Sequence, residues 1–368
     1  NFNIKNFINK IIILLSVFKM LKLEIEVENF NLNNTFFPSF ISSIYEKISE
    51  NEWIKIAGHL SGKLKLKQSK PNLLEVFCKE NLMKPALERR IILETGLWNE
   101  PFENKINLLP SSIRPQIEAL SNIYNGVRLP IAPLDIDYLL IAIILSKRAD
   151  YEKFVLKWCR KIWEKFNGKI DEIINAKYKE LKEIGTSYQI KQLKKTLKSF
   201  YSLSQDIKRI PKTIIERIGL PYIPTQELVL FLPPELARIT LNFGVWGMGP
   251  KTIDSFILSI HKATHFIPCD THLKIVSERL GLIKENEIIM PIKSYCARYA
   301  CTLKASKNYN LPLCPLAKDN ICIRSKLSYL DKLGGWFQTL AYLHGKKYCK
   351  IKNPKCEECP IKNVCIGK

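Results

Sequence analysis

The sequence has no apolar segment long enough to cross a lipid bilayer. Its hydrophobic opening stretch, residues 11–18, is far shorter than the roughly 20 residues that a membrane helix needs, and no small-residue cleavage site follows it. We therefore expect no membrane partner. Because the first methionine is Met20, residues 1–19 are interpreted as an extension or a mis-assigned start.

Acidic residues are also scarce. The chain has 35 Asp and Glu against 57 Lys and Arg, which gives a formal net charge of +22. Such an excess of positive charge indicates a polyanionic partner. The hydrophobic fraction of 46% and the charged fraction of 25% are ordinary for a globular protein, so the chain is not a disordered basic tail.

The sequence shows neither an internal repeat of fixed period nor a long flexible linker. From Met20 to about Cys78 apolar and polar residues alternate, which predicts a small antiparallel sheet with one hydrophobic face. Apolar residues then recur at intervals of three and four, which predicts helices over 87–97, 113–124, 136–145 and 154–166. We expect a mainly α protein, α+β overall, in which residues 20–112 form the sheet domain with its linking helices.

The eleven cysteines gather toward the C-terminus, which favours metal ligation over the disulfides of a secreted protein. The last four have the pattern C-x6-C-x2-C-x5-C. This uneven spacing does not fit the two separated pairs of a zinc ribbon, and it favours one [4Fe-4S] cluster. Two disulfides or a zinc knuckle remain alternatives. The four residues are Cys349, Cys356, Cys359 and Cys365.

The most informative internal stretch runs from Pro233 to Leu282. Its Pro-Pro pair predicts a helix start, because proline is tolerated in the first turn. Gly247 and Gly249 then allow a tight hairpin, and the next helix begins with exposed N–H groups that form a natural phosphate site. The Cys-Asp-Thr-His stretch at 269–272 opens a further helix. A Gly-x-Gly turn alone usually only connects two helices, so its interpretation depends on this context.

The hairpin Gly-Met-Gly-Pro-Lys-Thr at 247–252, the Cys-Asp-Thr-His stretch and the terminal cysteines follow one another in a known order. In this they resemble the helix-hairpin-helix DNA glycosylases of the endonuclease III superfamily. The resemblance covers residues from about 115 to 368. The preceding part is similar in layout to 3-methyladenine glycosylase II and 8-oxoguanine glycosylases, with a family-like entry at Gly126–Pro130. Those relatives generally lack the cluster, so this chain combines two patterns.

The resemblance implies a two-lobed helix-hairpin-helix glycosylase core at 113–340, interrupted by an insertion at 284–326, and an iron–sulfur loop at 341–368. It implies a monomeric base-excision-repair enzyme inside an archaeal cell, in the cytoplasm or at the nucleoid. Its partner is double-stranded DNA with a damaged or mismatched base. Lys251 matches the family's nucleophile, which forms a Schiff base for AP lyase activity by β-elimination. Asp270 matches the carboxylate that stabilises the cationic sugar or deprotonates the attacking group.

Other functions remain open at this stage. One alternative is a monofunctional glycosylase for alkylated or mismatched bases, in which Lys251 contacts phosphate and is not a nucleophile. The chain could also be an inactive DNA-binding relative, in which Asp270 only caps a helix. His272 is interpreted as structural. The residues do not indicate which base is excised.

The resemblance also implies DNA contacts. The family commonly has a glutamine or asparagine wedge after the Leu-Ser of a core helix, and this chain departs from that pattern at 146–150, which leaves the wedge unidentified. Arg148 could fill the gap left by the flipped base or read the orphan base, and the alternative is an ordinary surface arginine. The hairpin amides of Gly247 and Gly249, with Thr252, are expected to hold the phosphate backbone. Lysines of the C-terminal loop are expected to add salt-dependent contacts, namely Lys350, Lys352 and Lys355.

The insertion matches nothing in the family pattern and contains four more cysteines. We interpret them as a possible second metal site with zinc preferred, while disulfides or buried thiols remain alternatives. These residues are Cys296, Cys301, Cys314 and Cys322. The other three cysteines are expected to be structural, with Cys78 and Cys159 in the core and Cys269 beside the pocket.

Overall fold

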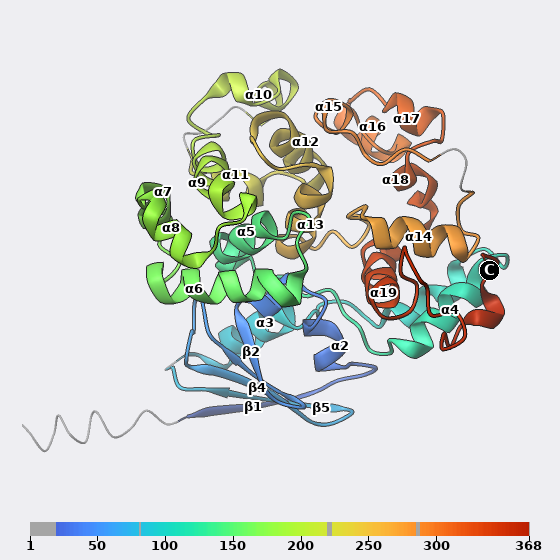
Figure 1. Ribbon diagram of the computed structural model, residues 1–368, viewed down its shortest axis with the longest axis horizontal. Helices are drawn as coiled ribbons and strands as arrows, with labels where there is room; N and C mark the ends of the chain where they lie inside the picture. Colours follow the sequence, from blue (N-terminus) through green and yellow to red (C-terminus); the bar gives the residue numbers. More distant parts are fainter. Residues whose placement is uncertain (1–19, 81, 219–222, 285–287, 368) are drawn as a thin grey trace, which may run out of the picture.

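The computed structural model describes residues 20–80, 82–218, 223–284 and 288–367. The predicted extension at 1–19 lies outside them. A five-stranded sheet lies on one side of two groups of helices, and the insertion forms a separate layer beside them (Figure 1). No helix in the described part of the chain is long and apolar enough to cross a membrane.

The predicted antiparallel sheet is confirmed. All of its neighbouring strands are antiparallel, and their order is β1-β5-β4-β3-β2. Alternate residues of β5 are buried, as expected for a sheet with one face on the core. The sequence pattern did not indicate β2. The strands are β1 (Leu21–Glu26), β2 (Tyr45–Ser49), β3 (Glu52–Lys55), β4 (Leu64–Lys70) and β5 (Leu73–Cys78).

The first group of helices surrounds α5, which is apolar on every side and is buried from Leu139 to Leu145. A helix of this kind belongs at the centre of a core. The short helices α2 (Leu32–Phe36) and α3 (Lys84–Glu94) lie between the sheet and this group. The members of the group are α5 (Ile136–Leu145), η4 (Tyr151–Val155), α6 (Leu156–Phe166), α7 (Ile170–Asn175), α8 (Tyr178–Ile184), α9 (Tyr188–Tyr201), α10 (Lys212–Ile218), α11 (Thr225–Phe231), α12 (Pro234–Gly244) and α13 (Pro250–Ile260).

The second group contains α4 (Arg114–Ile123), α14 (Thr271–Arg279) and α19 (Gly334–Lys347), and the cysteine loop at the C-terminus packs on it (Figure 1). The two groups confirm the predicted two-lobed α+β architecture. The insertion consists of very short helices. They are α15 (Lys293–Cys296), α16 (Leu303–Tyr309), α17 (Pro315–Lys318) and α18 (Ile323–Lys326).

Short 3-10 turns complete the fold. They connect the longer elements and add no layer of their own. These turns are η1 (Phe40–Ser43), η2 (Phe102–Leu108), η3 (Pro133–Asp135), η5 (Ile207–Arg209), η7 (Ser328–Leu333) and η8 (Lys362–Val364).

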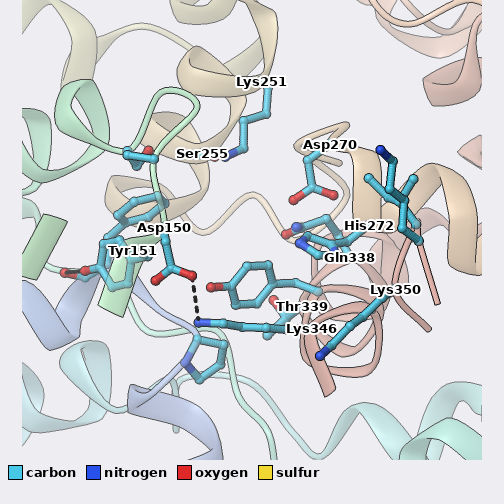
Figure 2. A pocket seen from close by; sticks show the side chains of 18 residues that line it. Asp150, Tyr151, Lys251, Ser255, Asp270, His272, Gln338, Thr339, Lys346 and Lys350 are labelled. Carbon is cyan, nitrogen blue, oxygen red and sulfur yellow. Dashed lines mark hydrogen bonds and ion pairs between the residues drawn. The ribbon is translucent and has the colours of Figure 1, made fainter. Parts of the chain in front are cut away.

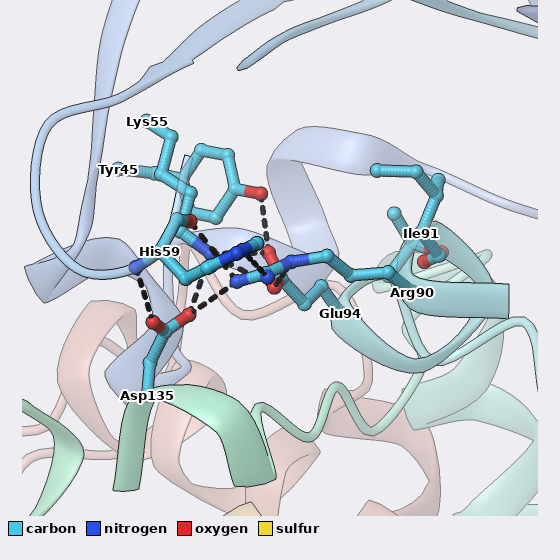
Figure 3. A network of polar contacts seen from close by, with 8 residues as sticks. Tyr45, Lys55, His59, Arg90, Ile91, Glu94 and Asp135 are labelled. Carbon is cyan, nitrogen blue, oxygen red and sulfur yellow. Dashed lines mark hydrogen bonds and ion pairs between the residues drawn. The ribbon is translucent and has the colours of Figure 1, made fainter. Parts of the chain in front are cut away.

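A buried network of ion pairs joins the sheet to the helices (Figure 3). Lys55, at the end of β3, places its Nζ 2.8 Å from Glu94 Oε1 on α3 and 2.6 Å from Asp135 Oδ2 before α5. Arg90 donates to the same two carboxylates, at 2.6 Å and 2.9 Å. Tyr45 donates a further hydrogen bond to Glu94. Two cations thus balance two anions, so this contact between sheet and helices carries no net charge.

Candidate active site

The hairpin between α12 and α13 has the conformation that its glycines predict. Gly247 has φ of +80°, and a Cβ there would lie 2.5 Å from Thr196 Oγ1, so only glycine fits. Lys147 Nζ donates to the carbonyl oxygen of Gly247 at 2.9 Å and supports the turn from α5. At Gly249 a Cβ would meet no described atom within 4 Å, which leaves that face of the turn open to an approaching strand.

The two predicted catalytic residues lie at the starts of facing helices. Lys251 is the second residue of α13, directly after Pro250, and its side chain is partly exposed. Asp270 is the N-cap of α14, where Oδ1 accepts a hydrogen bond from the amide of Leu273 at 2.8 Å. The capping role expected of a plain Asp-Thr-His stretch is therefore present, and the carboxylate stays partly exposed.

Lys251 and Asp270 line one cavity of about 530 Å³ between the two groups of helices. Figure 2 shows the two side chains pointing into the same space, Lys251 from α13 and Asp270 from α14. Apolar and aromatic side chains form part of the wall. These include Pro38, Phe40, Tyr151 and Tyr342. The hairpin and the Asp-Thr-His stretch, 18 residues apart at 252 and 270, are thus parts of one site.

Several charged residues at the cavity have no recognisable signal in the sequence. Lys346, near the end of α19, pairs with Glu152 and lies 3.9 Å from Asp150 (Figure 2). Burial, Glu152, Asp150 and Asp270 raise the pKa of Tyr342, so this phenol stays protonated beside the carboxylates. These groups come from segments almost 200 residues apart, and only the fold brings them together.

His272, interpreted from the sequence as structural, also lines the cavity. Its ring packs edge-on against Tyr342, at 5.5 Å between ring centroids. Gly345 on α19 permits this close approach, because a Cβ there would lie 2.6 Å from His272 Nδ1. In the described part of the structure this nitrogen has no hydrogen-bond partner. Cys269 is buried and does not itself line the cavity, but the next residue, Asp270, does.

The predicted DNA-contacting residues differ in their exposure and in whether they line the cavity. Arg148 is exposed with φ of +51°, a left-handed conformation that is uncommon outside glycine and asparagine, and its neighbours Ser146 and Ala149 line the cavity. Thr252 is only 6% exposed, so a contact through its hydroxyl would need a rearrangement. Lys350 and Lys352 line the cavity, whereas Lys355 pairs with Glu358 and faces the cysteine loop.

The four terminal cysteines surround a second cavity, of about 650 Å³. Arg279 Nη1 donates to Cys349 Sγ at 3.3 Å, and the backbone of residue 361 hydrogen-bonds Cys359. Donors of this kind suit anionic sulfur, so the residues fit a thiolate-bound cluster. Within the described ranges, no three His, Cys, Asp or Glu side chains are close enough together to bind one metal ion in their present positions.

Comparisons with known proteins support the fold described above. No family model matches the chain. A proposed DNA repair glycosylase from Methanocaldococcus jannaschii is 28% identical over 172 residues, which cover 46% of this chain and 62% of that protein. Endonuclease III from Sulfolobus acidocaldarius is 26% identical over 119 residues, which cover 32% and 40%. The chain thus spans less than two thirds of the length of either relative.

One solved structure matches almost the whole chain. It is the 8-oxoguanine glycosylase/lyase from Clostridium acetobutylicum in complex with double-stranded DNA containing cytosine opposite to 8-oxoG. Its TM-score is 0.59, at 16% identity, over 89% of this chain and 97% of that chain. The chain has the fold of the helix-hairpin-helix DNA glycosylases. The resemblance inferred from the sequence is confirmed for this glycosylase fold, including its N-terminal sheet.

Proposed function

We propose that the protein is a base-excision DNA glycosylase with associated AP lyase activity, acting inside the cell on double-stranded DNA. The observation that carries this proposal is the shared cavity of Lys251 and Asp270, beside a hairpin that leaves its Gly249 face open. A cavity of about 530 Å³ is large enough for a flipped-out base, and its aromatic side chains suit the faces of such a base.

The chemistry assigns different roles to the two residues. Lys251 Nζ attacks the anomeric carbon of the sugar, the bond to the base breaks, and the base leaves with a proton. The ring oxygen then leaves the anomeric carbon and takes up a proton from solvent, which gives a protonated Schiff base. Loss of a proton from the neighbouring sugar carbon then eliminates the 3′ phosphate. Asp270 stabilises the cationic sugar in the first step and accepts a proton from the attacking amine. Arg148, held outside the cavity, is the proposed wedge that replaces the flipped base.

The C-terminal loop is proposed to hold a [4Fe-4S] cluster through Cys349, Cys356, Cys359 and Cys365. The cluster would supply four strong cross-links to a loop that has few buried residues of its own. Since all four thiolates would bind iron, no open position remains for substrate. The cluster therefore fixes the loop that carries Lys350 and Lys352 beside the cavity.

Borohydride trapping tests the lyase assignment. With an oligonucleotide duplex that carries a substrate lesion, found from a panel of oxidised, deaminated and alkylated bases, we expect a covalent adduct with the native protein. Lys251→Gln should abolish the adduct, because the amide cannot form a Schiff base. The adduct is measured as a shifted band on a denaturing gel.

Lys262→Gln is the matched control, since Lys262 is an exposed lysine just beyond the end of α13 and does not line the cavity. This variant should trap as the native protein does. An adduct that survives Lys251→Gln would remove Lys251 as the nucleophile. Base release without any adduct in the native protein would instead identify a monofunctional glycosylase.

The basic loop makes a separate prediction about salt. Lys350→Ala/Lys352→Ala should weaken duplex binding and reduce the slope of log K against log salt concentration by about 2, if each lysine neutralises one phosphate. Lys67→Ala/Lys70→Ala removes the same charge from exposed positions on β4 and should leave the slope unchanged. Binding is followed by fluorescence anisotropy at several salt concentrations, and equal slopes for both variants would contradict the proposed contacts.

A further inference from the structure

The insertion contains a second set of cysteines that the fold collects in one place. Cys296 ends α15, Cys314 and Cys322 directly precede α17 and α18, and Cys301 lies between α15 and α16. All four line one cavity of about 10 Å³, and three of them are buried. No pair among them forms a disulfide in the structure. Four thiols from separate turns thus face one space about the size of a water molecule.

The backbone around these cysteines resembles that of the terminal set. Amides of Leu316 and Ala317 point at Cys314, and amides of Arg324 and Ser325 point at Cys322. Residue 361 does the same for the terminal cysteine Cys359. A backbone N–H directed at sulfur stabilises a thiolate more than a neutral thiol, because hydrogen bonds to ionised acceptors are the stronger ones. The backbone is thus arranged similarly around both sets, while burial raises the pKa of Cys314, Cys322 and Cys359 as free thiols.

Buried positive charge near the cavity also favours anionic groups there. Arg324 donates from Nη1 to Cys296 Sγ at 3.3 Å and to Cys301 Sγ at 3.5 Å, while its Nη2 binds Asp254. Arg238 is buried beside the same groups. In the described structure, Arg238 Nε and Nη2 and Arg324 Nε have no hydrogen-bond partner. Two buried cations thus face one buried carboxylate, an imbalance that thiolates would correct.

Four buried residues of the insertion join the main hydrophobic core, namely Ala300, Ala305, Leu311 and Ile323, and the rest of it has little else to stabilise it. Its helices α15, α17 and α18 have four residues each, far below the length at which a helix is stable alone. Its separate apolar cluster has a buried centre of only Cys314, Leu316 and Cys322. A segment with so small a core needs a cross-link, as small metal-binding domains do.

We propose that Cys296, Cys301, Cys314 and Cys322 bind one zinc ion in a tetrahedral four-thiolate site. The size of the cavity decides between a single ion and an iron–sulfur cluster, since about 10 Å³ contrasts with about 650 Å³ at the terminal set. Zinc binding draws the sulfurs inward to ligand distance, and Arg324 remains as a donor to two of them. The role of the ion is structural, because four protein ligands leave no open position.

This site has a direct connection to the hairpin. Lys293, three residues before Cys296 on α15, donates from Nζ to the carbonyl oxygen of Val245 at 2.6 Å. The α15 segment also packs against α12, which leads into the hairpin. The zinc site therefore holds α15 in place, and Lys293 on α15 supports the turn, as Lys147 also does.

Metal analysis of the full-length protein, purified without added metal, tests the proposal. We expect one zinc per chain beside about four iron. Cys314→Ala/Cys322→Ala should lose the zinc and keep the iron and its visible absorbance. Cys78→Ala/Cys159→Ala removes two buried cysteines outside both sets and should keep both metals. Hydrogen exchange at residues 244–250 should speed up only in the zinc-free variant.

Several results would overturn the proposal, and none depends on glycosylase activity. About four iron with no zinc in the native protein would remove the site, and about eight iron would replace the single ion by a second cluster. Four thiols missing from a titration of the denatured, unreduced, metal-free protein would show disulfides instead. If the double variant cannot be purified, the native metal content and the thiol count still decide between these outcomes.

Discussion

Asp270→Asn is expected to lower the rate of base release by about 100-fold or more while leaving the fold and duplex binding intact. The carboxylate faces the cavity from the start of α14, where the cationic sugar would lie. Loss of one group that stabilises developing charge typically costs a factor of about 10²–10³. Single-turnover excision of the base, with enzyme in excess, measures this step without product release.

The substitution separates the two roles of Asp270. Asparagine is as good an N-cap as aspartate, so the hydrogen bond from the amide of Leu273 is retained and only the negative charge is lost. Stability should therefore change by less than about 0.5 kcal/mol. Asp270→Ala loses the cap as well and should cost about 1 kcal/mol in addition to the activity.

Asp206→Asn is the matched control. Asp206 also caps a helical turn, through a hydrogen bond from the amide of Lys208 at 3.2 Å, but it is exposed and does not line the cavity. Its replacement should change neither stability nor base release. Asp270→Asn with the native rate would show that the carboxylate only caps α14, and the assigned role would then be wrong.

The parts of the molecule that the sequence predicted are those encoded by local patterns. The alternation in β1 and β5, the apolar run of α5 and the glycine hairpin each need only neighbouring residues. The cysteine spacing and the Asp-Thr-His stretch are local in the same sense. These patterns sufficed for the fold class and for the two candidate catalytic residues of the cavity.

The rest of the cavity depends on contacts between distant segments. Lys346 meets Glu152 across 194 positions, and Gly345 makes room for His272 across more than 70. Such pairs leave no periodic trace in one sequence, because each residue alone is an ordinary surface or helix residue. The burial of Thr252 was missed for a related reason, since the hairpin motif fixes its place along the chain but not the side of α13 that it occupies.

The ion-pair network at Lys55 is a further feature that no local pattern indicated, and it carries the second large prediction. Lys55→Met should destabilise the protein by about 3–5 kcal/mol, because it leaves Glu94 and Asp135 buried with only Arg90 as a cation. Methionine keeps most of the side-chain volume, so the loss reports the charge more than a cavity. Urea unfolding followed by tryptophan fluorescence gives the change in midpoint.

Lys65→Met is the matched control, because Lys65 pairs with Glu52 on the same sheet but is 38% exposed. An exposed pair contributes about 0–1 kcal/mol, so this variant should unfold close to the native midpoint. Equal midpoints for the two variants would contradict the importance assigned to the buried network.

Low pH should remove the stabilisation by the buried ion pairs of Lys55 from the native protein. Burial alone would raise the pKa of Glu94, but Lys55 and Arg90 outweigh it and hold that pKa below its ordinary value. A carboxylate with a lowered pKa in the folded state stabilises the protein above its unfolded pKa, and this stabilisation is lost as the pH falls through the folded value. The stability gap between the native protein and Lys55→Met should therefore be widest near neutral pH and should narrow on acidification. A gap that stays constant down to acid unfolding would mean that the loss arises from packing and not from the charges around Lys55.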